Sequence, residues 1–207
     1  SALDASVSGG NNTAIGKEAL TALTSGADNL AVGKGSLKAN TTASFNTGVG
    51  TNSLFVNSTG ANNTGLGYNS LVANTTASNN TAVGYIALTS NTTGTENVSI
   101  GAFALDSNTT GSYNTALGSR ALGLNVGANN NVAVGRSALT SNTNGGNNVA
   151  VGFEALVANT TADNNTGIGH SALAANTTGT QNVAVGAFAL DANTTATGNS
   201  ALGYASL

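Results

Sequence analysis

The sequence repeats itself every 17 residues, with no insertion or deletion to interrupt the register. Twelve Asn residues stand 17 apart, from Asn12 to Asn199. With each Asn counted as repeat position 1, position 5 is always Gly, position 9 is always Leu, and position 4 is always Val, Ile or Leu. Such strict self-similarity indicates a repeat architecture in which every unit stacks on the next. We therefore expect one repeat domain over residues 1–207, in register from Asn12 to Leu207 and with a partial repeat at 1–11.

The length and pattern of the repeat favour β-structure. Helix-pair repeats need more than about 30 residues. The run "NTAVG" at 80–84 alternates in period 2 and contains β-branched residues, and an Asn-Thr-Thr-Gly turn follows at 91–94. The sequence predicts an all-β fold, a parallel β-solenoid (β-roll) of about twelve 17-residue coils, each with two short strands and two turns. Coils about 4.8 Å apart would give a rod roughly 55–60 Å long.

Stacking turns each repeat position into a ladder along the rod. We expect the Asn amides to pass hydrogen bonds from coil to coil and the Gly residues to occupy bends with positive φ. We expect the aliphatic residue at position 4 and the Leu at position 9 to fill the interior, and the small residues at position 3 to admit a second chain. In mid-rod the predicted ladders consist of Asn80, Asn97, Asn114, Asn131, Gly84, Gly101, Gly118, Gly135, Leu88, Leu105, Leu122 and Leu139.

The run "NVAVG" at 131–135, repeated from Asn148 and Asn182, resembles the YadA-like head repeats of trimeric autotransporter adhesins, and related runs occur in phage tail-fibre proteins. The matching residues are positions 2 to 5 of each repeat, such as Val183 to Gly186. The resemblance implies a left-handed parallel β-roll, three chains side by side, and an adhesive role outside the cell. The period here is longer than the family's usual one, and the Asn-Thr-Thr-Gly turn lies outside its core signature.

Composition excludes several functional classes. Only 6% of residues are charged and the net charge is −3, so no basic field is available to hold nucleic acid. Absence of Cys excludes disulfides and thiolate metal sites. No apolar stretch approaches the roughly 20 residues that span a bilayer. We expect no nucleic-acid partner and no membrane-spanning segment.

Candidate catalytic and metal-binding residues are sparse. The acidic residues occupy different repeat positions, and Asp106 and Asp191, which share one position, stand five coils apart. His170 is the only His and has no acidic neighbour in its coil, while the pair Gly33 and Gly35 lacks the third Gly of a dinucleotide loop. We predict no enzymatic activity, no catalytic residues, no cofactor and no metal. The acidic residues are Asp4, Glu18, Asp28, Glu96, Asp106, Glu154, Asp163 and Asp191.

Aromatic residues and glycosylation motifs offer two further candidates. Tyr68, Tyr85, Phe103, Phe153 and Phe188 follow the repeat Gly by one or two residues, as Tyr204 does, and Phe45 and Tyr113 precede the repeat Asn. They would either bind a partner protein or sugar or pack against a neighbouring subunit or turn. Many N-glycosylation sequons occur, since an Asn row beside a Thr row creates them automatically, and they include those that begin at Asn40, Asn57, Asn74, Asn91, Asn108, Asn159, Asn176 and Asn193.

Two functions fit this sequence. The first is a structural fibre or adhesin rod, extracellular, on a cell surface or in a virion fibre, which self-associates as a trimer or end to end as a filament and attaches to a host-surface protein or glycan. The end-to-end reading rests on a repeat that continues to Leu207 without a capping change. The alternative is an ice-binding (antifreeze) solenoid. Its candidate surface is the Thr row at position 13, namely Thr41, Thr75, Thr92, Thr109, Thr143, Thr160, Thr177 and Thr194.

Overall fold

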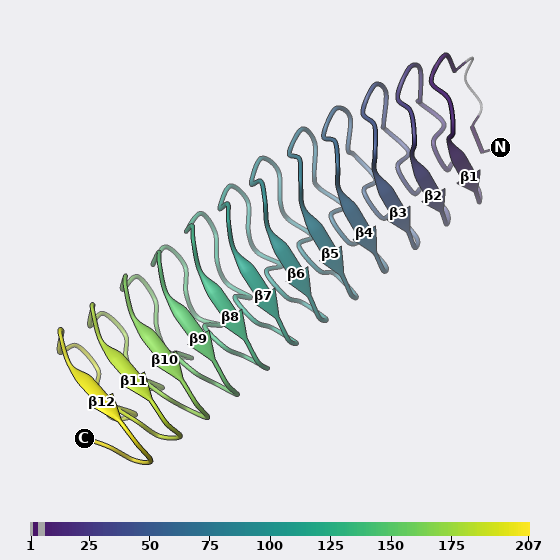
Figure 1. Ribbon diagram of the computed structural model, residues 1–207. Helices are drawn as coiled ribbons and strands as arrows, with labels where there is room; N and C mark the ends of the chain where they lie inside the picture. The colour runs from purple at the N-terminus through teal and green to yellow at the C-terminus, as the bar shows by residue number, and fades with distance from the viewer. Residues whose placement is uncertain (1, 4–6) are drawn as a thin grey trace.

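The computed structural model describes residues 2–3 and 7–207, and over these residues it contains twelve strands and no helix. The strands pair in parallel and in chain order to form one sheet, and each residue faces the residue 17 positions further on, as Val98 faces Thr115 (Figure 1). The strands are β1 (Thr13–Ile15), β2 (Leu30–Val32), β3 (Thr47–Val49), β4 (Thr64–Leu66), β5 (Thr81–Val83), β6 (Val98–Ile100), β7 (Thr115–Leu117), β8 (Val132–Val134), β9 (Val149–Val151), β10 (Thr166–Ile168), β11 (Val183–Val185) and β12 (Ser200–Leu202).

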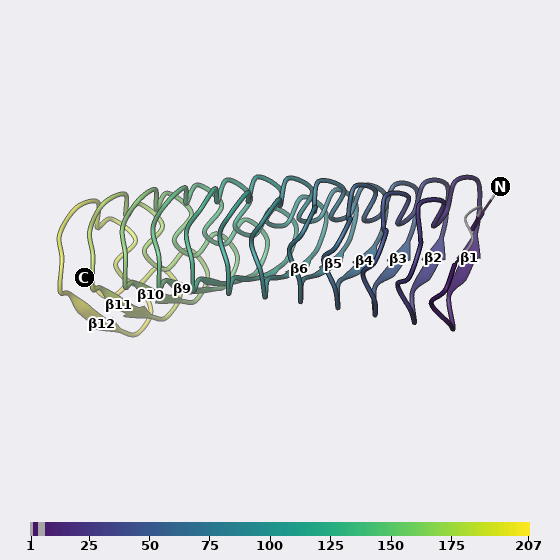
Figure 2. The same ribbon diagram turned by 90° about the horizontal axis from the view of Figure 1, so that it is seen from above.

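The chain winds into a straight rod with its two ends at opposite tips (Figures 1 and 2). Successive strands are separated by one 17-residue coil, so the predicted parallel β-solenoid is confirmed. The eleven intervals between β1 and β12, at about 4.8 Å each, give a stacked length of about 53 Å.

Each coil holds one strand, not the two that the sequence predicts. The second predicted strand, around positions 6 to 9, is interrupted by left-handed backbone. In one coil Gly101 has φ 136°, Phe103 has φ 57° and Leu105 has φ 51°. Because strands need negative φ, this alternation turns the chain sharply. The bend is nevertheless bonded to both neighbouring coils: the N–H of Phe103 donates to Tyr85 O at 3.0 Å, and that of Leu105 to Ala121 O at 3.0 Å.

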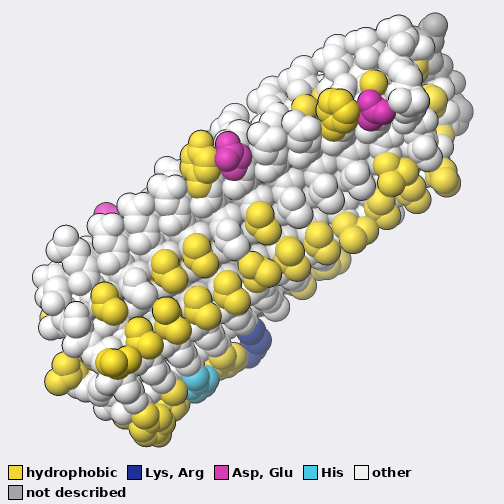
Figure 3. Space-filling view, in the orientation of Figure 1, with side chains coloured by type: hydrophobic (Ala, Val, Ile, Leu, Met, Phe, Trp, Pro, Cys, Tyr) yellow, Lys and Arg dark blue, Asp and Glu magenta, His cyan; other side chains and the backbone are white. Residues whose placement is uncertain are grey.

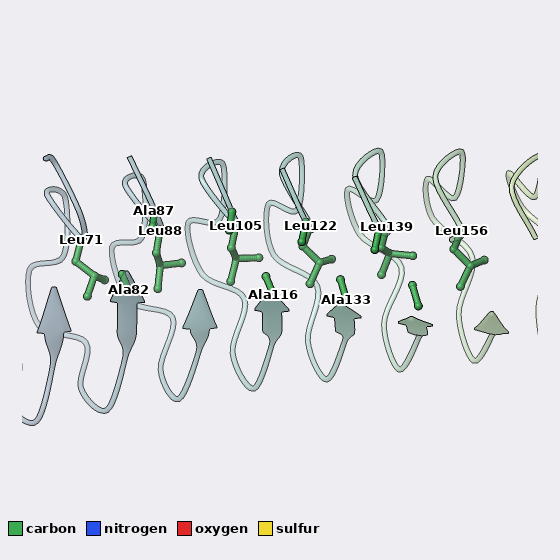
Figure 4. Packing of buried hydrophobic residues seen from close by; sticks show 14 of the residues in the cluster. Leu71, Ala82, Ala87, Leu88, Leu105, Ala116, Leu122, Ala133, Leu139 and Leu156 are labelled. Atoms are coloured by element: carbon green, nitrogen blue, oxygen red, sulfur yellow. The ribbon is translucent and has the colours of Figure 1, made fainter. Parts of the chain in front are cut away.

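Leu at position 9 fills one half of the interior, as predicted. From Leu20 to Leu173 these side chains are fully buried, and in Figure 4 they point from the bend toward the strands. The residues that face them from the strand are the small ones at position 3, such as Ala116 and Ala133, which are also fully buried. A Cβ at Gly48 in this row would lie 3.3 Å from Cγ of Leu37. The interior is therefore narrow, with room for one large aliphatic side chain per coil.

The predicted burial of position 4 is wrong. Ile15 is 60% exposed and Leu66 is 44% exposed, and the whole row points away from the interior. Successive side chains of a strand point to opposite faces. The Asn at position 1 is buried, so position 3 must also face inward, and positions 2 and 4 must face outward. Position 3 is consequently unavailable to a second chain, which corrects the expectation that its small residues admit one.

Asn side chains fill the other half of the interior in two ladders. The first is the predicted one at position 1: Asn97 Oδ1 accepts from the backbone N–H of Asn114 at 3.0 Å. The second ladder lies at position 12, and the sequence did not predict that its Asn side chains are buried. In this ladder Asn108 Nδ2 donates to Asn91 Oδ1 at 2.9 Å. Both ladders meet on one carbonyl per coil, since Asn97 and Asn108 each donate to Gly111 O at 2.9 Å. These bonds satisfy buried amides that would otherwise destabilise the fold.

The Gly ladder at position 5 brings successive coils into close backbone contact. A Cβ on Gly101, where φ is 136°, would lie 2.6 Å from the carbonyl carbon of Gly118 in the next coil. Both the backbone conformation and the stacking distance thus require glycine. The prediction that this row occupies bends with positive φ is confirmed from Gly16 to Gly203.

Candidate interaction surfaces

Outward-facing strand residues form a band that we call the aliphatic stripe, in which position 4 is aliphatic in every coil and position 2 is aliphatic in five coils and Thr or Ser in seven. It comprises positions 2 and 4 of all twelve strands. In Figure 3 hydrophobic side chains run as a band along the rod over the strands. Position 4 contributes Ile15, Val32, Val49, Leu66, Val83, Ile100, Leu117, Val134, Val151, Ile168, Val185 and Leu202, and position 2 contributes Thr13, Leu30, Thr47, Thr64, Thr81, Val98, Thr115, Val132, Val149, Thr166, Val183 and Ser200.

The stripe carries no charge along its length, and every one of its side chains is partly or largely exposed. Its width is two side chains, and its length is that of the sheet, about 53 Å. With a width of about 10 Å for two rows, its area is on the order of 500 Å². Because position 2 is Thr or Ser in seven coils, the apolar part is smaller than this area. The largest apolar patch of a typical monomer covers about 300–600 Å² and is often a binding surface.

Aromatic and planar cationic side chains form a second linear feature, which we call the aromatic row. It lies at positions 6 and 7 of the nine successive coils from β4 to β12. Its first half begins with Tyr68 and Tyr85, whose rings stack at 5.5 Å and 13°. Phe103 meets Tyr85 edge-on at 5.3 Å, and the Arg120 guanidinium lies 5.9 Å from the Phe103 ring centroid.

The second half of the aromatic row forms a separate series of contacts that runs to the last coil. The Arg136 guanidinium lies 5.5 Å from the Phe153 ring, which stacks on His170 at 5.3 Å and 9°. Phe188 then meets His170 edge-on at 4.7 Å and Tyr204 at 5.9 Å. The predicted partner-binding aromatics therefore fall into two contact groups: Tyr68, Tyr85 and Phe103 contact in series, whereas Phe153 and Phe188 each contact His170. Part of each ring is thus covered within the chain.

Two Thr rows lie beyond the turn at position 12. The predicted row at position 13 is partly exposed from Thr41 to Thr177, and the hydroxyls of these residues donate to the next coil, as Thr92 Oγ1 does to Thr109 O at 3.0 Å. Thr194, near the end of the rod, is exposed. The adjacent row at position 14 is exposed and is Thr in two unbroken runs. These runs are Thr42, Thr59, Thr76, Thr93 and Thr110, and then Thr161, Thr178 and Thr195.

The eight sequon asparagines named above belong to the second buried ladder, whereas sequons also begin at the exposed residues Asn11, Asn62, Asn79 and Asn164 and at the buried Asn97. Seven of the eight, from Asn40 to Asn176, are fully buried, and Asn193 near the end of the rod is partly buried. Asn91 illustrates their bonding, since its Nδ2 donates to Asn74 Oδ1 at 3.0 Å and to Gly94 O at 2.8 Å. A glycan on these amides is incompatible with the folded coil.

Titratable residues are scattered over the rod. Lys38 donates to Glu18 at 2.9 Å, and this hydrogen bond and charge lower the pKa of that exposed carboxyl. Burial raises the pKa of Asp106, while its own backbone N–H, Arg120 and the Ser107 N–H act in the opposite direction. In residues 2–3 and 7–207 no three His, Asp or Glu side chains gather at a possible metal site. Asp4 lies outside the described residues.

Comparison with known proteins finds no match for this chain. No family model matches the sequence, no curated protein is similar to it, and no solved structure matches the fold of the chain. A search of the described residues for a helix long and apolar enough to cross a bilayer finds none.

Proposed function

We propose that this protein is a structural rod of an extracellular fibre or adhesin, on a cell surface or a virion, which associates with copies of itself through the aliphatic stripe. The single observation that carries the proposal is the stripe itself: position 4 of all twelve coils holds Val, Ile or Leu and faces outward. Exposed side chains that serve only solubility would be polar. An unbroken aliphatic row therefore favours a permanent partner.

Copies of the same chain are the partner that fits the stripe best. A standard interface buries about 800 Å² per partner, so the stripe of about 500 Å² would form the central part of such an interface. Its side chains recur at the strand spacing of about 4.8 Å along the whole rod. A second surface with the same spacing, aligned in parallel, can interdigitate with it over its full length. Three chains around a common axis, as the resemblance implies, would bury every stripe.

The remaining faces are free for attachment, and we propose that a host-surface protein or glycan binds there. The proposal gives the chain no catalytic activity and no cofactor. This part of the proposal is supported by the wide scatter of the titratable groups along the rod. Among the described residues, Lys38 and Glu18 form the one ion pair.

Charge placed in the stripe tests this function. Val83→Lys with Val134→Lys introduces two positive charges on the stripe, whereas Thr89→Lys with Val157→Lys places the same charges at position 10 on another face. Light scattering should give the unmodified protein and the position-10 variant about three times the chain mass of 19.9 kDa. The stripe variant should show the monomer mass with an unchanged circular dichroism spectrum. An unmodified protein that is monomeric, or a stripe variant that still assembles, would refute the proposal.

Ice binding is the second candidate, and the exposed Thr row at position 14 is the observation that favours it. Five consecutive coils, from Thr42 to Thr110, present Thr at the strand spacing of about 4.8 Å. The row is interrupted at Gly127 and Asn144. Freezing-point hysteresis that disappears in Thr76→Lys with Thr93→Lys, and not in the stripe variant, would establish this function in place of the first.

A further inference from the structure

A notch interrupts the surface beside the aromatic row in the middle of the rod. It arises at Gly123, the one Gly at repeat position 10, where the other described coils have a side chain. The space left is about 380 Å³, within the range of about 300–1,000 Å³ that small-molecule sites occupy. Its walls come from three successive coils and consist of Phe103, Asp106, Arg120, Gly123, Leu124 and Thr140.

Oxygen atoms converge on the floor of the notch. A Cβ built on Gly123 would lie 3.4 Å from Asp106 Oδ1, 3.4 Å from Thr140 Oγ1 and 3.4 Å from Arg120 O. Asp106 and Thr140 occupy position 10 of the coils on either side, so the repeat itself aims them across the gap. A ligand hydroxyl in this space would meet one charged acceptor, one hydroxyl and one carbonyl.

Charge and apolar surface share the remaining wall. Phe103 stands nearly perpendicular to its neighbour Tyr85, at 76°, unlike the parallel rings at the start of the row. Asp106 and Arg120 line the same notch but form no salt bridge, since the one ion pair of the described residues lies elsewhere. Both therefore keep hydrogen-bonding capacity for a ligand. Burial, which raises the pKa of Asp106, indicates a carboxyl partly withdrawn from water.

We propose that the notch binds a single pyranose residue of a glycan. A sugar ring combines an apolar C–H face with several hydroxyls, which matches Phe103 and Leu124 beside Asp106, Arg120 and Thr140. An anionic ligand would be repelled by Asp106, and a simple cation would be repelled by Arg120. The hydroxyls of a neutral polyol can donate to the Asp106 carboxylate and accept from the Arg120 guanidinium. The inference deepens the proposed attachment role and rests on it, but the notch lies wholly within one chain, at positions 7 to 11 and away from the stripe.

A plugged notch gives a direct test. Gly123→Thr installs the Thr found at this position in the next coil, and the Gly123 backbone accepts it because its φ is not in the left-handed region and the new Cβ meets nothing closer than 3.4 Å. Ala174→Thr makes the same residue at position 10 three coils away and serves as the matched control. The probes are the methyl pyranosides of glucose, galactose, mannose and N-acetylglucosamine, with tetramethylammonium and inorganic phosphate as charged comparisons.

Saturation-transfer NMR should detect at least one pyranoside bound to the unmodified protein and to Ala174→Thr, and none bound to Gly123→Thr. Asp106→Asn should weaken binding by about tenfold, the effect of losing one charge-assisted hydrogen bond. No pyranoside binding, equal binding by Gly123→Thr, or preferential binding of either charged probe would overturn the inference. Light scattering on the same samples separates this outcome from a failure of self-association, because Gly123→Thr leaves the stripe intact.

Discussion

Leu105 both fills the core and forms part of the bend in its coil. Its side chain is fully buried, and its backbone has φ 51°, a conformation that costs a non-Gly residue about 1 kcal/mol or more. The same positive φ recurs at every Leu of this row from Leu20 to Leu207, and also at Leu3, and it coincides with full burial from Leu20 to Leu173. The packing of these buried Leu side chains against the small strand residues offsets the cost.

Leu105→Ala should therefore destabilise the rod by about 3 kcal/mol, since the narrow interior cannot collapse around the cavity. Leu124→Ala makes the same chemical change at a side chain that is 53% exposed, and should cost less than about 1 kcal/mol. Chemical denaturation followed by circular dichroism measures both. Equal losses for the two variants would mean that position 9 does not form the core.

Asn97 is the corresponding residue on the amide side of the interior. Asn97→Ala removes the acceptor of the Asn114 N–H and one of the two donors to Gly111 O. Leaving the buried N–H without a partner should cost about 3 kcal/mol. Asn144→Ala, at an exposed position 14, is the matched control and should be nearly neutral. A neutral Asn97→Ala, measured in the same denaturation assay, would contradict the ladder.

At the scale of the element, the Gly ladder sets how closely coils can stack. Gly101→Ala puts a Cβ on a backbone with φ 136° and 2.6 Å from Gly118, so it should cost about 3 kcal/mol or more. Gly123→Ala adds the same methyl group where the nearest atoms are 3.4 Å away, and should be tolerated. The difference in melting temperature between these two variants measures the requirement for glycine at position 5, and its absence would refute the requirement.

Within one coil, some features could be predicted from the 17-residue repeat and others could not. The period, the parallel pairing and the burial of Leu follow from the sequence, because equal residues must stack. The orientation of the strand was predicted wrongly, since positions 3 and 4 are both apolar and a three-residue strand gives little alternation to read. The orientation follows from Asn97 and Ser99, which stand two residues apart and are both buried. Because side chains two apart on a strand point to the same face, a buried Asn at position 1 requires a buried residue at position 3.

The notch illustrates a second limit. Asp106, Gly123 and Thr140 stand 17 residues apart, so the repeat places them side by side, and a Gly that occurs once at position 10 is a visible signal. The contribution of Arg120 from position 7 could not be read in this way. It depends on the left-handed bend, where φ of Arg120 is 61°, and this bend replaces the strand that the sequence predicts.

At the scale of the whole molecule, the solenoid presents a different set of side chains on each face. The interior holds Leu on one side and Asn on the other, the sheet presents the aliphatic stripe, the next face carries the aromatic row with the notch, and the far turns carry the Thr rows. Each face extends over the length of the rod because every coil repeats the same positions. Self-association through one face would leave the others accessible, which is the arrangement an attachment fibre needs.

Inter-copy distances measured by dipolar electron paramagnetic resonance test this arrangement most directly. The chain has no Cys, so Thr81→Cys on the stripe or Thr93→Cys on the exposed Thr row each carries one nitroxide label per chain, and any dipolar coupling must arise between copies. Association through the stripe predicts strong coupling with short distances for the label at position 81, longer distances for the label at 93, and loss of both on dilution with unlabelled protein. Absence of coupling at 81, or shorter distances at 93 than at 81, would contradict it.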